Sequence, residues 1–173
     1  MIRILLADDH PVVREGLRAM LSVEPDLKVV ADAAGGPRAE ALAAALLPDV
    51  ILMDLRMPDG DGVASIQRIT RAGLPCRVVV LTTYETDRDI LRAVEAGAAG
   101  YLLKDMPRAE LADAIRAAAR GETVLAPSVA TRLMDQLRTI PTRPHLSERE
   151  KSVLRLVAEG CTNAEIGRQP ARR

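Results

Sequence analysis

The 173-residue sequence contains no phenylalanine and no tryptophan, and it has only two tyrosines. A hydrophobic core in this chain must therefore be packed from aliphatic residues. Hydrophobic residues make up 48% of the chain and charged residues 28%, which is typical of a globular protein and excludes a disordered one. The length allows one domain of ordinary size with a small second unit.

Cysteine is also scarce. Cys76 and Cys161 form neither a pair pattern nor a metal-binding spacing, which excludes a disulfide framework and fits a reducing compartment. The first apolar run, Ile2–Ala7, is too short for a signal peptide, and no run reaches the roughly eighteen apolar residues that a membrane-spanning helix needs. We therefore expect a cytoplasmic protein without a membrane partner.

The net charge is zero, but the charges are unevenly distributed. Acidic residues are in excess over residues 1–120, and basic residues are in excess over residues 121–173. A basic C-terminal part suggests a polyanionic partner there, although the excess is small.

Five short apolar runs recur every 22 to 28 residues, beginning near Ile2, Lys28, Val50, Val78 and Tyr101. Apolar residues at helical spacing lie between and after them, over residues 13–21, 37–46, 63–72, 87–96 and 111–119. Continuous apolar runs are typical of parallel strands that are buried on both faces. Because crossovers between such strands are right-handed, the pattern predicts an α/β fold with a doubly wound, five-stranded parallel sheet.

Polar residues follow four of these runs. Asp8 and Asp9 come after the first run, Asp54 after the third, Thr82 after the fourth and Lys104 after the fifth. Functional sites of doubly wound sheets lie at the carboxyl ends of the strands, so we expect these side chains to share one cleft. Three close carboxylates repel one another unless a cation lies among them, and Mg²⁺ suits an open site with oxygen ligands. The sequence therefore predicts a site for a metal ion and a phosphoryl group.

Each of these residues also has a purely structural explanation. The acids before Pro11 can cap a helix, and Asp54 can begin a turn. Thr82 can be an ordinary strand residue, and Lys104 an ordinary surface lysine. We favour the structural explanation for any one acid alone, but a site for three acids at adjoining strand ends. His10 is interpreted as a cap or a solvent-facing residue and not as a catalytic base.

The remaining sequence predicts a linker and a second unit. We expect the first domain over residues 1–120 and a linker over residues 121–145, with a helix that begins at Pro127. Pro141 and Pro144 interrupt the chain after this helix and mark a boundary.

Two capping boxes follow in residues 146–173. Ser147 with Glu150 and Thr162 with Glu165 each predict the start of a helix, and a glycine separates the two helices. Two short helices joined at a glycine turn are typical of the front of a helix-turn-helix.

Several segments resemble those of a known family. The segments Leu5-Leu-Ala-Asp-Asp-His-Pro-Val-Val-Arg-Glu-Gly-Leu17, Met53-Asp-Leu-Arg-Met-Pro-Asp-Gly-Asp-Gly62 and Gly100-Tyr-Leu-Leu-Lys-Asp105 resemble the receiver domain of two-component response regulators. Leu146-Ser-Glu-Arg-Glu150 and Thr162-Asn-Ala-Glu-Ile166 resemble the opening of a LuxR-type DNA-binding domain. Together they resemble the NarL/FixJ class of response regulators. This resemblance implies a flavodoxin-like receiver fold, control by phosphorylation and a role in transcription.

The resemblance also implies roles for matching residues. Asp54 would be the phosphoacceptor, taking a phosphoryl group from a sensor histidine kinase. Mg²⁺ would be bound directly by Asp9, by Asp54 and by the backbone carbonyl of Arg56, while Asp8 would act mainly through water. Lys104 would pair with the phosphoryl group.

Two further residues would form the switch. Thr82 would move toward the phosphoryl group, and Tyr101 would swing inward. Tyr101 can alternatively be a half-buried edge residue. Members of the family commonly form a homodimer through receiver helices, and the resemblance extends that hypothesis to this chain.

The sequence departs from the family pattern near its end. A LuxR-type domain is a bundle of four helices, whereas residues 146–173 leave room for about two, and no recognition helix follows. We therefore expect this chain to keep the phosphorylation switch without competent DNA reading, although DNA would be a partner of a full-length form. DNA-binding residues stay unknown.

Two other functions remain open. One is a receiver-only interaction module that acts through a protein contact. The other is a metal-dependent hydrolase that works through an aspartyl-phosphate and needs a second acid two residues after the nucleophile. That position holds Arg56, which cannot act as a general acid. We therefore expect no enzyme activity beyond slow self-phosphorylation and self-dephosphorylation at Asp54.

Overall fold

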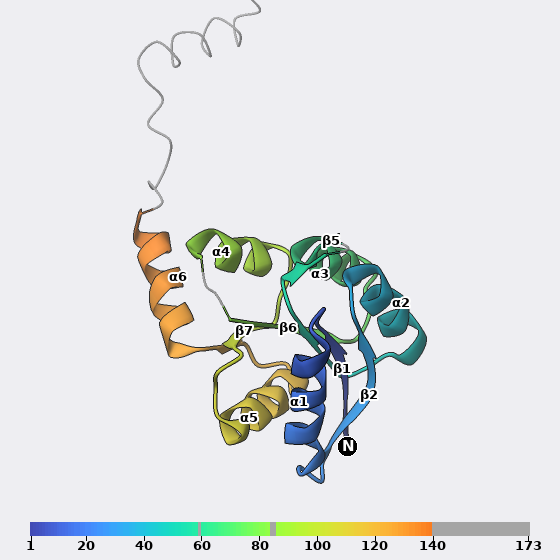
Figure 1. Cartoon of the computed structure of the whole chain (residues 1–173). Helices are drawn as coiled ribbons and strands as arrows, with labels where there is room; N and C mark the ends of the chain where they lie inside the picture. Colours follow the sequence, from blue (N-terminus) through green and yellow to red (C-terminus); the bar gives the residue numbers. More distant parts are fainter. Residues whose placement is uncertain (59, 84–85, 140–173) are drawn as a thin grey trace, which may run out of the picture. The chain divides into compact units, whose positions relative to one another are not determined.

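The computed structural model describes residues 1–58, 60–83 and 86–139 (Figure 1). The strands in this part of the chain are β1 (Ile2–Ala7), β2 (Leu27–Ala33), β3 (Val50–Met53), β4 (Arg56–Met57), β5 (Gly60–Asp61), β6 (Arg77–Thr82), β7 (Gly100–Leu103) and β8 (Val124–Leu125). The helices are α1 (Pro11–Ser22), α2 (Gly36–Leu46), α3 (Gly62–Arg71), α4 (Asp87–Glu95), α5 (Arg108–Ala119) and α6 (Pro127–Thr139). The strands and helices predicted before residue 140 occur, with ends within a few residues of those expected.

The main sheet is parallel and has the strand order β2-β1-β3-β6-β7-β8. Its first five strands are the five predicted from the apolar runs. The order changes direction at β1, which lies between β2 and β3, and such a switch point is where doubly wound sheets form their sites. The predicted flavodoxin-like α/β fold is confirmed.

Two short pairings were not predicted. Strand β8 adds a sixth, two-residue strand beside β7, so the first part of segment 121–145 continues the main sheet. A Cβ on Gly100 would lie 2.4 Å from Val124 Cγ2, so the close approach of β8 depends on glycine at this position. Strands β4 and β5 form a small antiparallel hairpin directly after β3.

Side chains of the strands alternate between two hydrophobic clusters. Leu5, Ile51 and Val80 face a cluster completed by residues of α2, α3, α4 and α6. Ile4 and Leu52, one residue away along the same strands, face a second cluster with residues of α1 and α5. Figure 1 shows α1 and α5 on one face of the sheet and α2, α3 and α4 on the other. Because both faces are covered, the central strand β3 is apolar and buried at all four of its positions.

The compact unit built on this sheet comprises Met1–Leu137, and a second unit comprises Arg138–Arg173. The predictions for residues 146–173 lie outside the described residues.

Arg116 on α5 binds the segment before β2. Its Nε and Nη2 atoms donate to the two carboxylate oxygens of Asp26 at 2.8 and 2.7 Å, and Nη2 also lies 2.8 Å from Glu24 Oε2. The hydrogen bonds from Arg116 lower the pKa of Asp26 from 3.8 to about 2. The interaction therefore joins two distant parts of the chain in a way that depends on pH.

We expect Asp26→Asn to flatten the pH dependence of stability at acid pH. Because folding lowers the pKa of Asp26, its contribution is fully present above a pH of 3.8 and is lost as the pH falls through about 2. The free energy of unfolding should be measured by urea denaturation and far-UV circular dichroism at several pH values. The control is Glu15→Gln, which removes the charge of an exposed carboxylate on α1. Equal slopes for Asp26→Asn and the wild type would contradict the prediction.

Candidate functional site

The site lies where four strands of the main sheet end. Asp8 follows β1, Asp54 follows β3, Thr82 is the last residue of β6 and Lys104 follows β7. Their backbones extend the sheet hydrogen bonds: Asp54 N donates to Ala7 O at 2.8 Å, and Lys104 N donates to Thr82 O at 2.9 Å. The strand pairing therefore fixes the backbone positions of these residues at one edge of the sheet.

Lys104 lies between two carboxylates. Its Nζ atom is 2.5 Å from Asp8 Oδ2 and 2.6 Å from Asp54 Oδ2. The three side chains are 10%, 4% and 7% exposed, respectively, so Lys104 is not an ordinary surface lysine. Burial lowers the pKa of Lys104, but the hydrogen bonds and charges of Asp54 and Asp8 together outweigh that effect and raise its pKa. The ammonium therefore stays charged and offsets part of the negative charge of Asp8 and Asp54.

The other oxygens of these two carboxylates accept hydrogen bonds from the backbone. Asp8 Oδ1 accepts from His10 N at 2.9 Å, and Asp54 Oδ1 accepts from Arg56 N at 3.2 Å. In both cases the donor is two residues after the acid, which is the geometry of an Asx turn. These turns hold the carboxylates at the ends of their strands.

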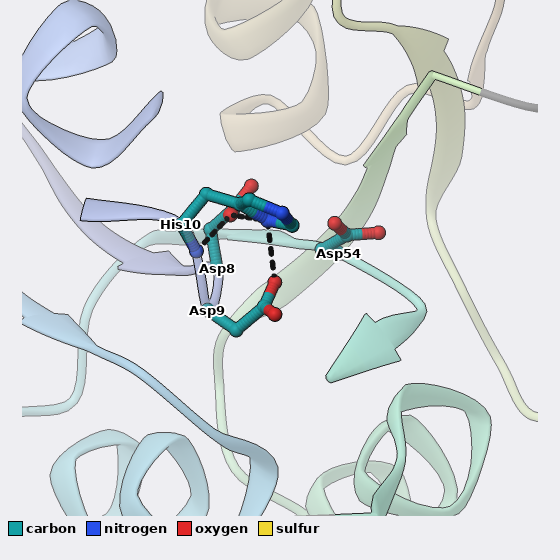
Figure 2. Close-up of side chains that lie close together, drawn as sticks. All are labelled: Asp8, Asp9, His10 and Asp54. Atoms are coloured by element: carbon teal, nitrogen blue, oxygen red, sulfur yellow. Dashed lines mark hydrogen bonds and ion pairs between the residues drawn. The ribbon is translucent and has the colours of Figure 1, made fainter. Parts of the chain in front are cut away.

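Asp9 differs from its neighbours. Its Oδ1 atom is buried and accepts no hydrogen bond from the described part of the chain. This oxygen lies 2.7 Å from Nδ1 of His10, which in turn is 3.4 Å from Asp8 Oδ1 (Figure 2). A buried carboxylate oxygen without a donor is costly unless a cation satisfies it.

One ligand atom from each of Asp8, Asp9, His10 and Asp54 lies within 4.8 Å of the others. Figure 2 shows these four side chains gathered at the ends of β1 and β3. Carboxylate oxygens are the protein ligands that Mg²⁺ prefers, and Asp9 Oδ1 accepts no hydrogen bond from the described residues. The residues present therefore fit an acidic site for Mg²⁺.

The predicted switch residues are both buried. Thr82 is 3% exposed, and its side chain lines a pocket of about 270 Å³ together with His10, Val13, Asp54, Arg56, Thr83 and Lys104. Tyr101 is 1% exposed and belongs to the core cluster that contains Ile90 and Ala93 of α4. Tyr101 is therefore not a half-buried edge residue.

His10 was expected to be a cap or a solvent-facing residue. It does precede α1 as the N-cap residue, and its side chain is 66% exposed. Its ring nevertheless lines the pocket and contacts the two neighbouring acids. A histidine directly after an acid pair was the sequence signal for this contact.

Sequence reasoning missed the support of the β1–α1 loop. Arg14 of α1 donates from Nη1 to the carbonyl oxygen of Asp8 at 2.6 Å and from Nε to Asp32 Oδ2 at 3.1 Å. Arg18, one turn further along α1, also binds Asp32. This network holds the backbone that carries Asp8 and Asp9 against the end of β2.

The hairpin after Asp54 is tied to α4 by two ion pairs. Arg56 Nη2 lies 3.8 Å from Asp89 Oδ2, and Asp61 binds Arg92. Asp61 also caps α3 by accepting a hydrogen bond from Val63 N at 3.0 Å. The backbone next to the site is therefore connected to both helices that follow it.

Two segments of the chain match known protein families. Residues 4–116 match the response regulator receiver domain, and residues 144–170 match the bacterial regulatory proteins of the luxR family. The first match covers the sheet and the acidic site described above. The chain therefore belongs to the response regulators of two-component systems.

Individual relatives cover most of the chain. It is 45% identical to the transcriptional regulatory protein LiaR of Bacillus subtilis (strain 168), over 98% of this chain and 82% of that protein. It is 39% identical to the response regulator protein VraR of Staphylococcus aureus, over 95% of this chain and 79% of that protein.

Solved structures show the same similarity. The response regulator ChrA of a heme-sensing two-component system matches with a TM-score of 0.67 and 44% identity, over 96% of this chain and 79% of that chain. A structure of two RcsB dimers bound to two parallel DNAs matches with a TM-score of 0.70 and 28% identity, over 96% of this chain and 81% of that chain.

No helix in residues 1–58, 60–83 and 86–139 has the length and apolar composition needed to span a membrane.

We expect Gly62→Ala to destabilise the protein at the site. A Cβ on Gly62 would lie 2.5 Å from the carbonyl oxygen of Asp54 and 2.7 Å from Leu55 Cα, so the backbone that carries Asp54 would have to move. The free energy of unfolding, measured by urea denaturation, should fall by about 1–3 kcal/mol. The control is Gly16→Ala on α1, where a Cβ meets nothing within 4 Å. That change should increase the free energy of unfolding by about 0.5–1 kcal/mol. A Gly62→Ala protein as stable as the wild type would refute this account.

Proposed function

We propose that this chain is a transcriptional response regulator whose receiver domain is switched by phosphorylation of Asp54, with a sensor histidine kinase as the donor. One observation carries the proposal: Lys104 Nζ lies 2.5–2.6 Å from carboxylate oxygens of Asp8 and Asp54 at the ends of three strands. A buried ammonium beside a carboxylate nucleophile is suited to a group that arrives with negative charge.

Asp54 is the proposed nucleophile. One of its carboxylate oxygens would form a bond to phosphorus while the bond from phosphorus to the kinase imidazole breaks, and the leaving imidazole would take up a proton from water. Asp54 is 6% exposed as a residue but lines the open pocket, so a donor group can reach it.

Lys104 would stabilise the negative charge of the phosphoryl group during this transfer. Its ammonium already contacts Asp54 Oδ2, and a short movement would bring it to an oxygen of the phosphoryl group. Asp8 would retain one side of the ammonium, which limits how far Lys104 can turn away.

The proposed metal ligands are Asp9, Asp54 and the backbone carbonyl of Arg56, with Asp8 acting through water. Asp9 supports this assignment best, because its buried Oδ1 accepts no hydrogen bond from the described residues. When bound there, Mg²⁺ supplies positive charge that offsets the phosphoryl oxygens during transfer.

Thr82 and Tyr101 are the proposed switch residues. A Thr82 hydroxyl that turns toward the phosphoryl group would vacate space beside β7, and the buried Tyr101 ring would readjust against Ile90 and Ala93 of α4. If the receiver has an inactive and an active conformation, phosphorylation must stabilise the active one by about 5.5 kcal/mol to change the active-to-inactive population ratio from 1:99 to 99:1.

The proposed domains are a receiver over residues 1–120, a linker over residues 121–145 and a LuxR-type segment over residues 146–173. The luxR-family match over residues 144–170 supports DNA as the partner of that segment. The similarity to RcsB, solved as dimers on DNA, supports a homodimer as the form that binds DNA.

A hydrolase is the weaker alternative. The residue two positions after Asp54 is Arg56, whose guanidinium has no readily released proton and lies near Asp89. A receiver-only module would share the phosphorylation chemistry and differ in lacking specific DNA binding. A gel shift at several ionic strengths distinguishes it, because nonspecific phosphate contacts weaken steeply with salt.

Intact mass spectrometry tests the phosphoacceptor. After incubation with Mg²⁺ and a small acyl phosphate, the wild type should gain one phosphoryl group, and Asp54→Ala should gain none. Asp113→Ala, which removes a 78% exposed carboxylate on α5, should be phosphorylated like the wild type. Phosphorylation of Asp54→Ala at the wild-type level would overturn the assignment. Release of more than one phosphate per protein molecule from small phosphate esters would favour the hydrolase.

Isothermal titration calorimetry tests the metal ligands, since the chain has no tryptophan to report binding by fluorescence. Asp9→Asn should lower the affinity for Mg²⁺ by at least about tenfold, because even groups that only orient metal ligands contribute that much. Glu95→Gln, at an exposed position of α4, should bind Mg²⁺ like the wild type. Unchanged Mg²⁺ affinity in Asp9→Asn would exclude Asp9 as a direct ligand.

A further inference from the structure

We propose that Arg14 is a positioning residue for the phosphorylation reaction, and that Asp32 holds Arg14 in the orientation that this role requires. The inference rests on the proposed function, because it concerns how Asp8 and Asp9 of that site are held. It assigns a role in the reaction to residues of α1 and β2 that are not among those lining the pocket.

Arg14 binds the peptide group that joins the two acids. Its Nη1 atom donates to the carbonyl oxygen of Asp8 at 2.6 Å, and this oxygen belongs to the peptide between Asp8 and Asp9. A peptide group is planar and rigid, so a bond to its oxygen restrains the whole plane. The orientation of that plane sets the direction in which the chain passes from Asp8 to Asp9. Arg14 therefore acts on the position of the Asp9 side chain through the backbone.

The groups on either side of this peptide are held by backbone donors. Asp8 N donates to Ala33 O at 3.0 Å, which continues the pairing of β1 with β2. Asp8 Oδ1 accepts from His10 N at 2.9 Å, which closes the turn after the acids. The peptide between Asp8 and Asp9 is held by a side chain instead, so a substitution can loosen the loop at this point.

Asp32 fixes the rotation of the Arg14 guanidinium. Arg14 Nε donates to Asp32 Oδ2 at 3.1 Å while Nη1 reaches the Asp8 carbonyl. Because a guanidinium is planar and rigid, two bonds from different nitrogens leave it little freedom to turn. The Arg14 side chain is only 15% exposed, so water competes weakly for these bonds. Asp32 is therefore the second member of the positioning arrangement.

Arg18 provides a natural comparison. It lies one turn further along α1 and binds the other carboxylate oxygen of Asp32, and its side chain is 37% exposed. Arg14 and Arg18 both fasten α1 to β2 through Asp32, but the hydrogen bond to the Asp8 carbonyl comes from Arg14. If these arginines served only to hold the helix on the sheet, loss of either one should have similar consequences. A positioning role predicts an effect on the site from Arg14 alone.

The expected effect is on the step that needs the Asp8–Asp9 loop. Residues that only orient metal ligands commonly contribute about 10- to 100-fold to metal affinity. Asp54 is positioned separately, since its backbone N–H donates to Ala7 O at 2.8 Å within the sheet. Loss of Arg14 should therefore weaken the use of Mg²⁺ while leaving transfer to Asp54 nearly unchanged once Mg²⁺ is saturating.

The full chain should be compared as the wild type, Arg14→Met and Arg18→Met. Isothermal titration calorimetry measures Mg²⁺ affinity, and intact mass spectrometry measures the initial rate of phosphorylation by a small acyl phosphate at several Mg²⁺ concentrations. We expect Arg14→Met to lower Mg²⁺ affinity and to raise the half-saturating Mg²⁺ concentration, each by about tenfold. Its rate at saturating Mg²⁺ should stay within about twofold of the wild-type rate, and Arg18→Met should stay within about twofold in all three quantities.

Two further variants test the geometry. Arg14→Lys keeps the positive charge but replaces the planar fork with a single ammonium, so it should resemble Arg14→Met. Asp32→Asn leaves Arg14 in place and removes the charge that orients it, so it should lower Mg²⁺ affinity in the same direction. Asp32→Asn also tests the proposal if Arg14→Met does not fold, as judged by far-UV circular dichroism.

Several results would contradict the positioning role. These are Mg²⁺ affinities that are equal in Arg14→Met and Arg18→Met, wild-type affinity in Arg14→Lys or in Asp32→Asn, and absence of Mg²⁺ binding by the wild type. If the wild type binds Mg²⁺ but is not phosphorylated, the proposed function fails, and the calorimetric comparison still decides the role of Arg14. If the wild type is phosphorylated and the two Met variants behave alike, only the positioning role fails.

Discussion

The ion pairs of Lys104 with Asp8 and Asp54 are the interaction on which the site depends. Three acids at one edge of a sheet repel one another, and removal from water makes each charge more costly. Lys104 meets this constraint with one ammonium that contacts two of the carboxylates at 2.5 and 2.6 Å. The three residues follow β1, β3 and β7, so the contact exists only when these strands lie in the observed order with β6 between β3 and β7. The charge arrangement and the sheet topology therefore require each other.

Exposure increases outward from this contact. Lys104, Asp8 and Asp54 are nearly buried, whereas His10 and Arg56, each two residues after one of the acids, are largely exposed. The inner residues are suited to hold charge in a fixed geometry, and the outer ones can adapt to what enters the pocket. Arg56 also links the site to α4 through Asp89, so an event at Asp54 has a short physical route to the surface of the domain.

Much of the fold followed from patterns in the sequence. The continuous apolar runs marked the five strands, because strands covered on both faces tolerate few polar residues. The acids, Thr82 and Lys104 could be assigned to one edge because carboxyl ends of parallel strands meet there. The short strands β4, β5 and β8 escaped prediction, since two residues carry no periodicity. The bonds from Arg14 to Asp32 and to the Asp8 carbonyl were also missed, because they depend on how α1 packs beside β2.

The sequence by itself determined which residues form strands, which side chains follow them and which family the segments resemble. Only the tertiary structure decided which atoms meet: that Lys104 lies between Asp8 and Asp54, that Asp9 keeps an oxygen without a donor and that the His10 ring faces it. The physical reason is that apolar periodicity depends on neighbours along the chain, whereas these contacts join residues up to 96 positions apart and depend on strand order, on loop geometry and on side-chain rotation.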